Sequence, residues 1–155
     1  MNPTTQQQAL DLCNLAMRTA LALIDTRPTT DPYAPPALAE GEIYVGLIVA
    51  GTRREHIVLL PGDTEAKWTD AMKWAESIGG ELPDRVESAL LFATLKDQFK
   101  PEWHWTREQH ASYSDCAWMQ GFDSGDQHGG HKVSSCRARA VRRSPIPQFN
   151  HLAGV

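Results

Sequence analysis

Four prolines, Pro28, Pro32, Pro35 and Pro36, stand close together near the N-terminus. Proline fixes its own φ and lacks an amide donor, so a segment this dense suits neither a helix interior nor a central strand. The segment 25–42 is therefore predicted to be an extended, semi-rigid linker. We expect two parts: residues 1–40, a helix and linker, and residues 41–155, a compact domain large enough to bury its own core.

The stretch from Thr4 to Ile24 is predicted to form an amphipathic helix. It is rich in strong helix formers, and Thr4 or Thr5 can cap its start. Apolar residues recur at spacings of seven, four and three, which places them in one stripe. The stripe can pack on the compact domain, on a second copy or on a larger assembly. A helix held away from the domain by a stiff linker suits packing on a second copy or on a larger assembly. The candidates for oligomerisation or docking are therefore Leu10, Cys13, Met17, Leu21 and Ile24.

The compact domain begins with a predicted hairpin followed by two predicted helices. "EIYVGLIVAG" and "HIVLLPG" have β-rich patterns, with a turn expected at Gly51 and "TRRE". A helix is expected over 64–80 and ends at a Gly-Gly pair. In the second helix, Asp84 and Glu87 have the spacing of a capping box. The first half of the domain is therefore predicted to contain both strands and helices.

The rest of the domain is predicted to contain short strands and no helix. "EWHWT", "CAWMQGF", "KVSS" and "CRARAVRR" have strand patterns, and the tail from Ser144 is expected to be irregular. Strands that flank a pair of helices indicate the α+β class. The arginines of "CRARAVRR" could form a patch for phosphate or sugar acids, or lie on the outer face of a strand.

Composition argues against several classes of protein. The formal net charge is −4, which disfavours broad nucleic-acid binding, because such binding neutralises phosphates. No apolar run approaches the roughly 20 residues that span a bilayer, so no membrane insertion is expected. The N-terminus lacks the basic region of a Sec signal peptide. Because no such signal is present and the number of cysteines, three, is odd, reduced thiols are expected. Cys116 and Cys136 could still pair if their strands are neighbours.

No catalytic residue, metal or cofactor is predicted. The hydrolase pattern G-x-S-x-G is absent, and the nearby carboxylates suit turns and helix caps. Asp123, Asp126, His128 and His131 carry ligand atoms, but the Gly-Gly between the histidines fixes no geometry. The polar stretch "DSGDQHGGHKVSS" is instead either a displayed binding surface, mounted between two strands, or a plain exposed loop.

Two blocks of sequence resemble a domain family common in phages and prophages. They are "KWTDAMKWAESIGGELPDRVESALLFA" and "HWTREQHASYSDCAWMQGFDSGDQHGGHKVSSCRARAVRR". The family includes the C-terminal domain of a collagen-like bacterial adhesin and is similar to the variable proteins of diversity-generating retroelements. The resemblance covers residues 41–143. It implies a C-type-lectin-like domain of the formylglycine-generating-enzyme subtype, preceded here by the N-terminal helix and Pro-rich linker.

The resemblance implies binding rather than catalysis, on a near-flat face of variable side chains. Trp105, Ala117, Trp118, Phe122 and Ala140 match scaffold positions, and Lys132 and the arginines match the fixed framework. Retroelement targets often carry many Asn and Tyr in the variable segment, which this chain lacks, and the closely placed cysteines of the oxidase relatives are missing. The ligand-binding candidates are Tyr113, Asp115, Met119, Asp123, Ser124, Asp126, His128, Gly129, Gly130, His131 and Ser134.

The function expected from this resemblance is that of a phage- or prophage-encoded receptor-binding or adhesin-like protein. Its ligand would be a host-surface protein or glycan. The N-terminal helix would contact other phage structural proteins or form a homo-oligomer, with the protein in the tail or surface of the virion. The alternatives are a structural or accessory particle component, and an intracellular phage protein that binds a host factor in the host cytoplasm.

Overall fold

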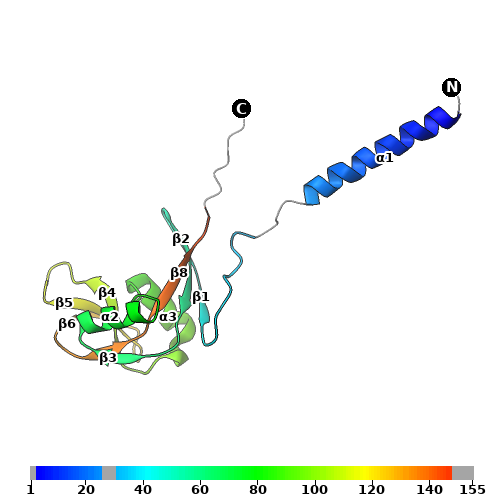
Figure 1. Ribbon diagram of the computed structural model, residues 1–155. Helices are drawn as coiled ribbons and strands as arrows, with labels where there is room; N and C mark the ends of the chain where they lie inside the picture. The colour runs from blue at the N-terminus through cyan, green and yellow to red at the C-terminus, as the bar shows by residue number, and fades with distance from the viewer. Residues whose placement is uncertain (1–2, 26–30, 148–155) are drawn as a thin grey trace. The chain divides into compact units, whose positions relative to one another are not determined.

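The computed structural model describes residues 3–25 and 31–147, and the chain divides into two units, Met1–Ala34 and Pro35–Val155 (Figure 1). The first unit holds helix α1, Pro3–Asp25, which confirms the helix predicted at the N-terminus. After it, the Asp31 carboxylate accepts a hydrogen bond from the Tyr33 amide at 2.9 Å. Part of the predicted linker, residues 26–30, lies outside the described residues.

The apolar side chains of helix α1 that the structure describes are exposed. Leu10 is 54% exposed and Met17 is 69% exposed, and Cys13 is also exposed. The side chains of Leu21 and Ile24, two further docking candidates, lie outside the described part of the chain. The described part of the stripe therefore has no cover within α1's own unit.

The second unit contains two sheets. β1 (Ile43–Ala50), β2 (Arg53–Leu59) and β8 (Val141–Pro145) form one antiparallel sheet in the order β1–β2–β8. The other sheet has the order β3–β7–β4–β5–β6. Its strands are β3 (Thr64–Ala66), β4 (Trp103–Gln109), β5 (Cys116–Gly121), β6 (Gln127–His131) and β7 (Cys136–Ala138).

Helix α2 (Trp68–Ser77) packs on the larger sheet, helix α3 (Arg85–Leu95) contacts both sheets, and a 3-10 turn, Lys96–Gln98, follows α3 (Figure 1). Helix α2 contacts β3 and β4, and α3 contacts β1, β4 and β5. The predicted α+β class is confirmed.

Two predicted element boundaries near the start of the domain are wrong. The "TRRE" turn belongs mostly to β2, because Arg53, Arg54 and Glu55 pair with the end of β1 and only Gly51 and Thr52 make the turn. The helix expected from residue 64 begins at Trp68. Residues 64–66 form β3 instead, since they pair with β7.

Two predictions near the C-terminus are also wrong. "CRARAVRR" is not one strand: β7 pairs with β3 in the larger sheet, and β8 pairs with β2 in the smaller one. "KVSS" is a turn, whereas the predicted polar loop contains β6, which pairs with β5 along its length. Glycine suits this strand because a Cβ at Gly129 would come within 3.1 Å of the His110 ring, and one at Gly130 would collide with Met119.

The core consists of two clusters of buried apolar side chains. Trp105 is the largest member of the cluster beside α2, and its indole N–H donates to the Ala66 carbonyl at 2.9 Å. Phe122 and Leu91 belong to the second cluster, which includes residues of β1, β2 and α3. Of the expected scaffold residues, Trp105, Ala117, Phe122 and Ala140 are buried and Trp118 is partly buried.

The Gly-Gly pair after α2 has two separate roles. Gly79 has φ +85°, the left-handed conformation that ends a helix. Gly80 allows close packing, because a Cβ there would lie 2.7 Å from the Val141 carbonyl oxygen. The next residue, Glu81, is thereby able to form a backbone bridge with Val141 of β8.

A fully buried carboxylate, Glu87, links α3 to the smaller sheet. The predicted capping box is present, with Glu87 accepting from the Asp84 amide at 2.7 Å and Asp84 accepting from the Glu87 amide at 2.8 Å. Glu87 also accepts two hydrogen bonds from Arg143 of β8, at 2.6 and 2.8 Å, and forms an ion pair with Arg53 of β2. A buried charge is tolerated only when it is paired in this way.

The other arginines near the C-terminus are also used inside the domain. Arg142 binds the Glu42 carboxylate at 2.6 and 2.8 Å, and this contact, together with the Ala39 amide, lowers the pKa of Glu42 to about 2. Arg137 binds Glu102 at 3.0 Å, and Arg139 donates to the carbonyl of Gln98. The cluster is therefore framework, and not an outward patch for phosphate.

His104 is a buried imidazole beside this framework. Its Nδ1 lies 2.9 Å from the Glu102 carbonyl oxygen, and its ring packs edge-on against Phe99 and Phe122. Burial lowers the pKa of His104 to about 4, with a further contribution from the positive charge of Arg139. The folded protein therefore holds this side chain neutral at pH values where an unfolded chain would protonate it.

This lowered pKa predicts loss of stability in mild acid. An unfolded histidine titrates near 6.5, so the contribution of neutral His104 is fully present above about pH 6.5 and is lost as pH falls towards 4. The free energy of unfolding should fall by up to about 3 kcal/mol through this group. In urea titrations across that range, His104→Asn should lose less stability than the unmodified protein. Equal losses in both proteins would contradict the assignment.

Candidate functional site

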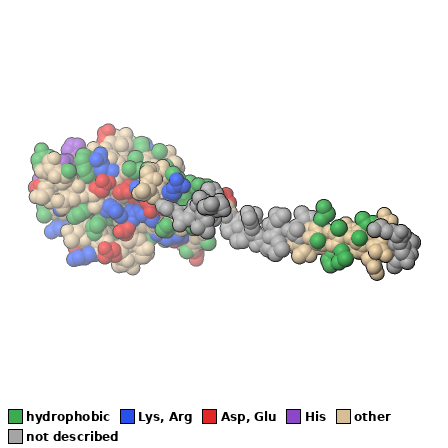
Figure 2. All heavy atoms as spheres, turned by 90° about the horizontal axis from the view of Figure 1, so that it is seen from above, with side chains coloured by type: hydrophobic (Ala, Val, Ile, Leu, Met, Phe, Trp, Pro, Cys, Tyr) green, Lys and Arg blue, Asp and Glu red, His purple; other side chains and the backbone are tan. Residues whose placement is uncertain are grey.

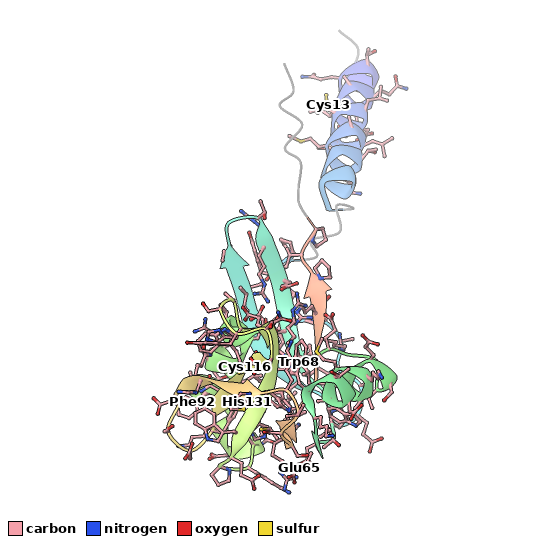
Figure 3. The ribbon with its side chains drawn as sticks, turned by 90° about the vertical axis from the view of Figure 1, so that its left-hand side faces the viewer. Cys13, Glu65, Trp68, Phe92, Cys116 and His131 are labelled. Carbon is pink, nitrogen blue, oxygen red and sulfur yellow. The ribbon has the colours of Figure 1, made fainter. Side chains whose placement is uncertain are left out.

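The outer hairpin of the larger sheet, β5–β6, carries most of the predicted surface residues. Cys116 and His131 stand opposite each other in the register, as do Trp118 and Gly129, so their side chains share one face. Figure 3 labels Cys116 and His131 close together on these neighbouring strands. Met119 pairs with His128 at the next register position, where the alternation of the strands turns Met119 towards the other side of the sheet, while His128 on the outermost strand still borders the hollow described below.

A hollow of about 320 Å³ opens beside this hairpin. Its volume is at the small end of the range usual for ligand pockets. Its lining contains Tyr113, Asp115, His128, Gly129 and His131 from the predicted set. It also contains His110 and Cys116, which the sequence analysis missed as site residues. Both lie where a strand meets the loop between β4 and β5, which also carries Tyr113 and Asp115, and that position was the available signal.

An aromatic platform lies next to the hollow. The His110 ring stacks on Trp118 with centroids 4.6 Å apart, and Tyr113 packs against His110 at 4.9 Å. The Arg85 guanidinium lies over the Trp118 ring, 3.8 Å from its centroid, and donates to Gln127 at 2.9 Å. The platform is thereby connected to helix α3 as well as to the sheet.

Three potential ligand atoms lie together at one end of the hollow. His131 Nδ1 is 3.2 Å from Asp115 Oδ2 and 3.7 Å from Cys116 Sγ. The pKa of the Cys116 thiol is raised by desolvation and then by the neighbouring charge of Asp115. Reactive cysteines have lowered pKa values, so this thiol is not set up as a nucleophile. The group has instead the donor chemistry of a metal site.

Asp123, Ser124 and Asp126 lie away from the hollow, in the turn between β5 and β6. There the Asp123 carboxylate accepts from the Ser124 amide at 2.8 Å, and Gly125 has φ +88° beside Phe92. Asp123 also lines a second hollow, of about 360 Å³, with Trp103, Glu102 and Arg137 among its walls.

Three further candidates also lie away from the first hollow. Met119 is partly buried, with its sulfur 3.4 Å from Cys136 Sγ, and Gly130 lies against it. Ser134 is exposed in the turn after β6. The eleven predicted ligand-binding residues are therefore spread over two faces and two turns, and do not form one surface.

Lys132 and the three cysteines were also given expected roles from the sequence. Lys132 donates to Gln109 and to the Ser114 carbonyl, both at 2.7 Å, and lies over the Trp68 ring, as a framework residue would. Cys13, Cys116 and Cys136 are all free thiols. The pairing of Cys116 with Cys136 that the sequence left open does not occur.

Figure 2 shows acidic and basic side chains intermixed over the visible face of the second unit, with histidines gathered at one end. No protein-family model matches the chain, and no curated protein is significantly similar to it in sequence. Within residues 3–25 and 31–147, no helix combines the length and apolar character that crossing a membrane requires.

Proposed function

We propose that this chain is a phage- or prophage-encoded ligand-binding protein, without catalytic activity, whose binding face surrounds the hollow at β5–β6. The observation that carries the proposal is the convergence of five predicted surface residues on that hollow. They are Tyr113, Asp115, His128, Gly129 and His131. These residues come from two segments of the chain that the β5–β6 register brings together.

The exposure of these side chains supports a displayed surface. Tyr113 is 61% exposed, and the side chains of Asp115 and His131 are 68% and 67% exposed. The fold is held elsewhere, by Trp105, Phe122 and the buried Glu87. Side chains that the core does not need can vary or bind without loss of the fold.

The chemistry of the face suits a host-surface protein or glycan. His110, Tyr113 and Trp118 offer aromatic surface, and Asp115 and His131 add hydrogen-bonding groups around a hollow large enough for one sugar ring or one side chain. Rigid aromatics beside adaptable polar groups are typical of binding loops.

The proposal extends to the subtype of the fold, to the partner that helix α1 binds and to the location of the protein. The α+β arrangement and the internal arginines agree with the C-type-lectin-like domain that the sequence resemblance implies. In this proposal the protein resides in the virion tail or surface. Helix α1 binds other particle proteins or a second copy through the stripe of Leu10, Cys13 and Met17.

The binding proposal is tested with Tyr113→Ala/His128→Ala in the full chain. Both side chains are exposed, so the fold should be retained. Binding of the labelled protein would be measured on a glycan array and on a panel of intact bacterial cells. Each ligand found with the unmodified chain should bind the double variant about 30-fold or more weakly, the loss expected when an interface anchor is removed.

The matched control for this experiment is Lys73→Ala/Glu76→Ala on the exposed side of α2, which should bind normally. Equal binding by the double variant and the unmodified chain would contradict the placement of the face. This pair of substitutions leaves Asp115, Cys116 and His131 unchanged.

A second candidate function, a structural or accessory particle component, is favoured by one observation. The described apolar side chains of α1 are exposed, and an apolar stripe of this kind is normally buried against a partner. In this function α1 carries the principal contact and the β5–β6 face does not.

Deletion of residues 1–40 separates the two candidates. If α1 is only a mount, the truncated protein should keep its ligand affinity and lose incorporation into particles, together with any oligomer seen by light scattering. If the domain itself is structural, the Tyr113→Ala/His128→Ala protein should fail to incorporate although its helix is intact. Incorporation of the truncated protein at the full-length level would exclude a role for α1 in docking.

A further inference from the structure

We infer that Asp115, Cys116 and His131 form a binding site for a divalent transition-metal ion of the zinc type. The three residues lie at the open end of the β5–β6 hairpin, away from its turn. Cys116 is the first residue of β5, His131 is the last residue of β6, and Asp115 comes directly before β5. Their donor atoms all lie within 4.8 Å of one another. The inference rests on this geometry and goes beyond the proposed ligand-binding function.

The distances fit a tetrahedral ion with little rearrangement. Zinc bonds of about 2.0–2.3 Å place neighbouring ligand atoms roughly 3.3–3.8 Å apart. The two distances from His131 Nδ1, 3.2 Å to Asp115 Oδ2 and 3.7 Å to Cys116 Sγ, are close to that range. An Asp–His ion pair alone would explain the first distance, but it would not require a thiol at the second.

The backbone on each side of the three residues is held by hydrogen bonds. The Lys132 amide donates to the Asp115 carbonyl at 2.9 Å, and the His110 amide donates to the Cys116 carbonyl at 3.0 Å. The Ser134 amide donates to the His131 carbonyl at 2.9 Å. The ligand positions are therefore set by strand pairing and tight turns, so binding would order little additional chain.

The donor set selects the class of metal. A thiolate, an imidazole and a carboxylate suit zinc and its neighbours, whereas calcium and magnesium take oxygen ligands. Binding would release the thiol proton of Cys116 to solvent and would use His131 in its neutral form. The hollow beside the three residues leaves a fourth position open to water or to a group of a bound ligand.

Metal titration of the full chain tests the site. The reduced protein, freed of metal by a chelator, would be titrated with zinc by calorimetry and with cobalt by absorption spectroscopy. We expect one ion per chain and a thiolate-to-cobalt charge-transfer band. Cys116→Ser should abolish the band, and Cys116→Ser and His131→Ala should each weaken binding by more than about tenfold. Both variants should keep the unmodified circular dichroism spectrum, because the two positions lie at the hairpin surface.

The controls are the two other thiols. Cys136→Ser, on the opposite face of the sheet, and Cys13→Ser, in the first unit, should bind metal as the unmodified chain does. Absence of the cobalt band in the unmodified chain would overturn the inference, as would unchanged affinity in Cys116→Ser or His131→Ala. Loss of binding in Cys13→Ser would also overturn it, by assigning the metal to α1. None of these results depends on finding the protein or glycan ligand.

Discussion

The buried carboxylate of Glu87 is the contact on which the arrangement of this domain depends. One side chain caps α3, accepts a bidentate hydrogen bond from Arg143 of β8, and pairs with Arg53 of β2. A helix and two strands from distant parts of the sequence are thereby fixed to one point. Because a fully buried charge is costly when unpaired, alternative packings of these elements are disfavoured. The β5–β6 hairpin lies outside this network, which leaves its exposed side chains free for binding.

Local signals in the sequence predicted part of this fold. These signals are the Asp84–Glu87 capping box, the Gly-Gly pair that ends α2 and the β-rich hairpin. Each depends on only a few neighbouring residues, so it can be recognised in the sequence alone. Strand partners depend on distant residues, and the errors fall there. Thr64–Ala66 forms a strand because β7 lies beside it, and the arginine-rich segment splits because its two ends join different sheets. Nothing in the local pattern distinguishes these cases.

The sequence predicted which kinds of residue form the candidate site better than it predicted which of them lie together. Composition left the Gly- and His-rich stretch as either a displayed surface or a plain exposed loop, and three of its residues, His128, Gly129 and His131, line a hollow. The same stretch was expected to be a loop from its small, polar composition, but residues 127–131 form β6 because they pair with β5. The two glycines of β6 leave room for the His110 ring and the Met119 side chain. Cys116 was missed because its relation to His131 exists only in the β5–β6 register.

The central claim, that the framework and the binding face are separable, is tested most directly by comparing two variants in metal-free urea unfolding. Glu87→Gln removes one buried charge, and Tyr113→Ala/Asp115→Ala/His131→Ala removes three exposed side chains. The account predicts a loss of about 3 kcal/mol or more in the free energy of unfolding for Glu87→Gln and about 1 kcal/mol or less for the triple variant. A triple variant as unstable as Glu87→Gln would contradict it, because the face would then be part of what holds the fold together.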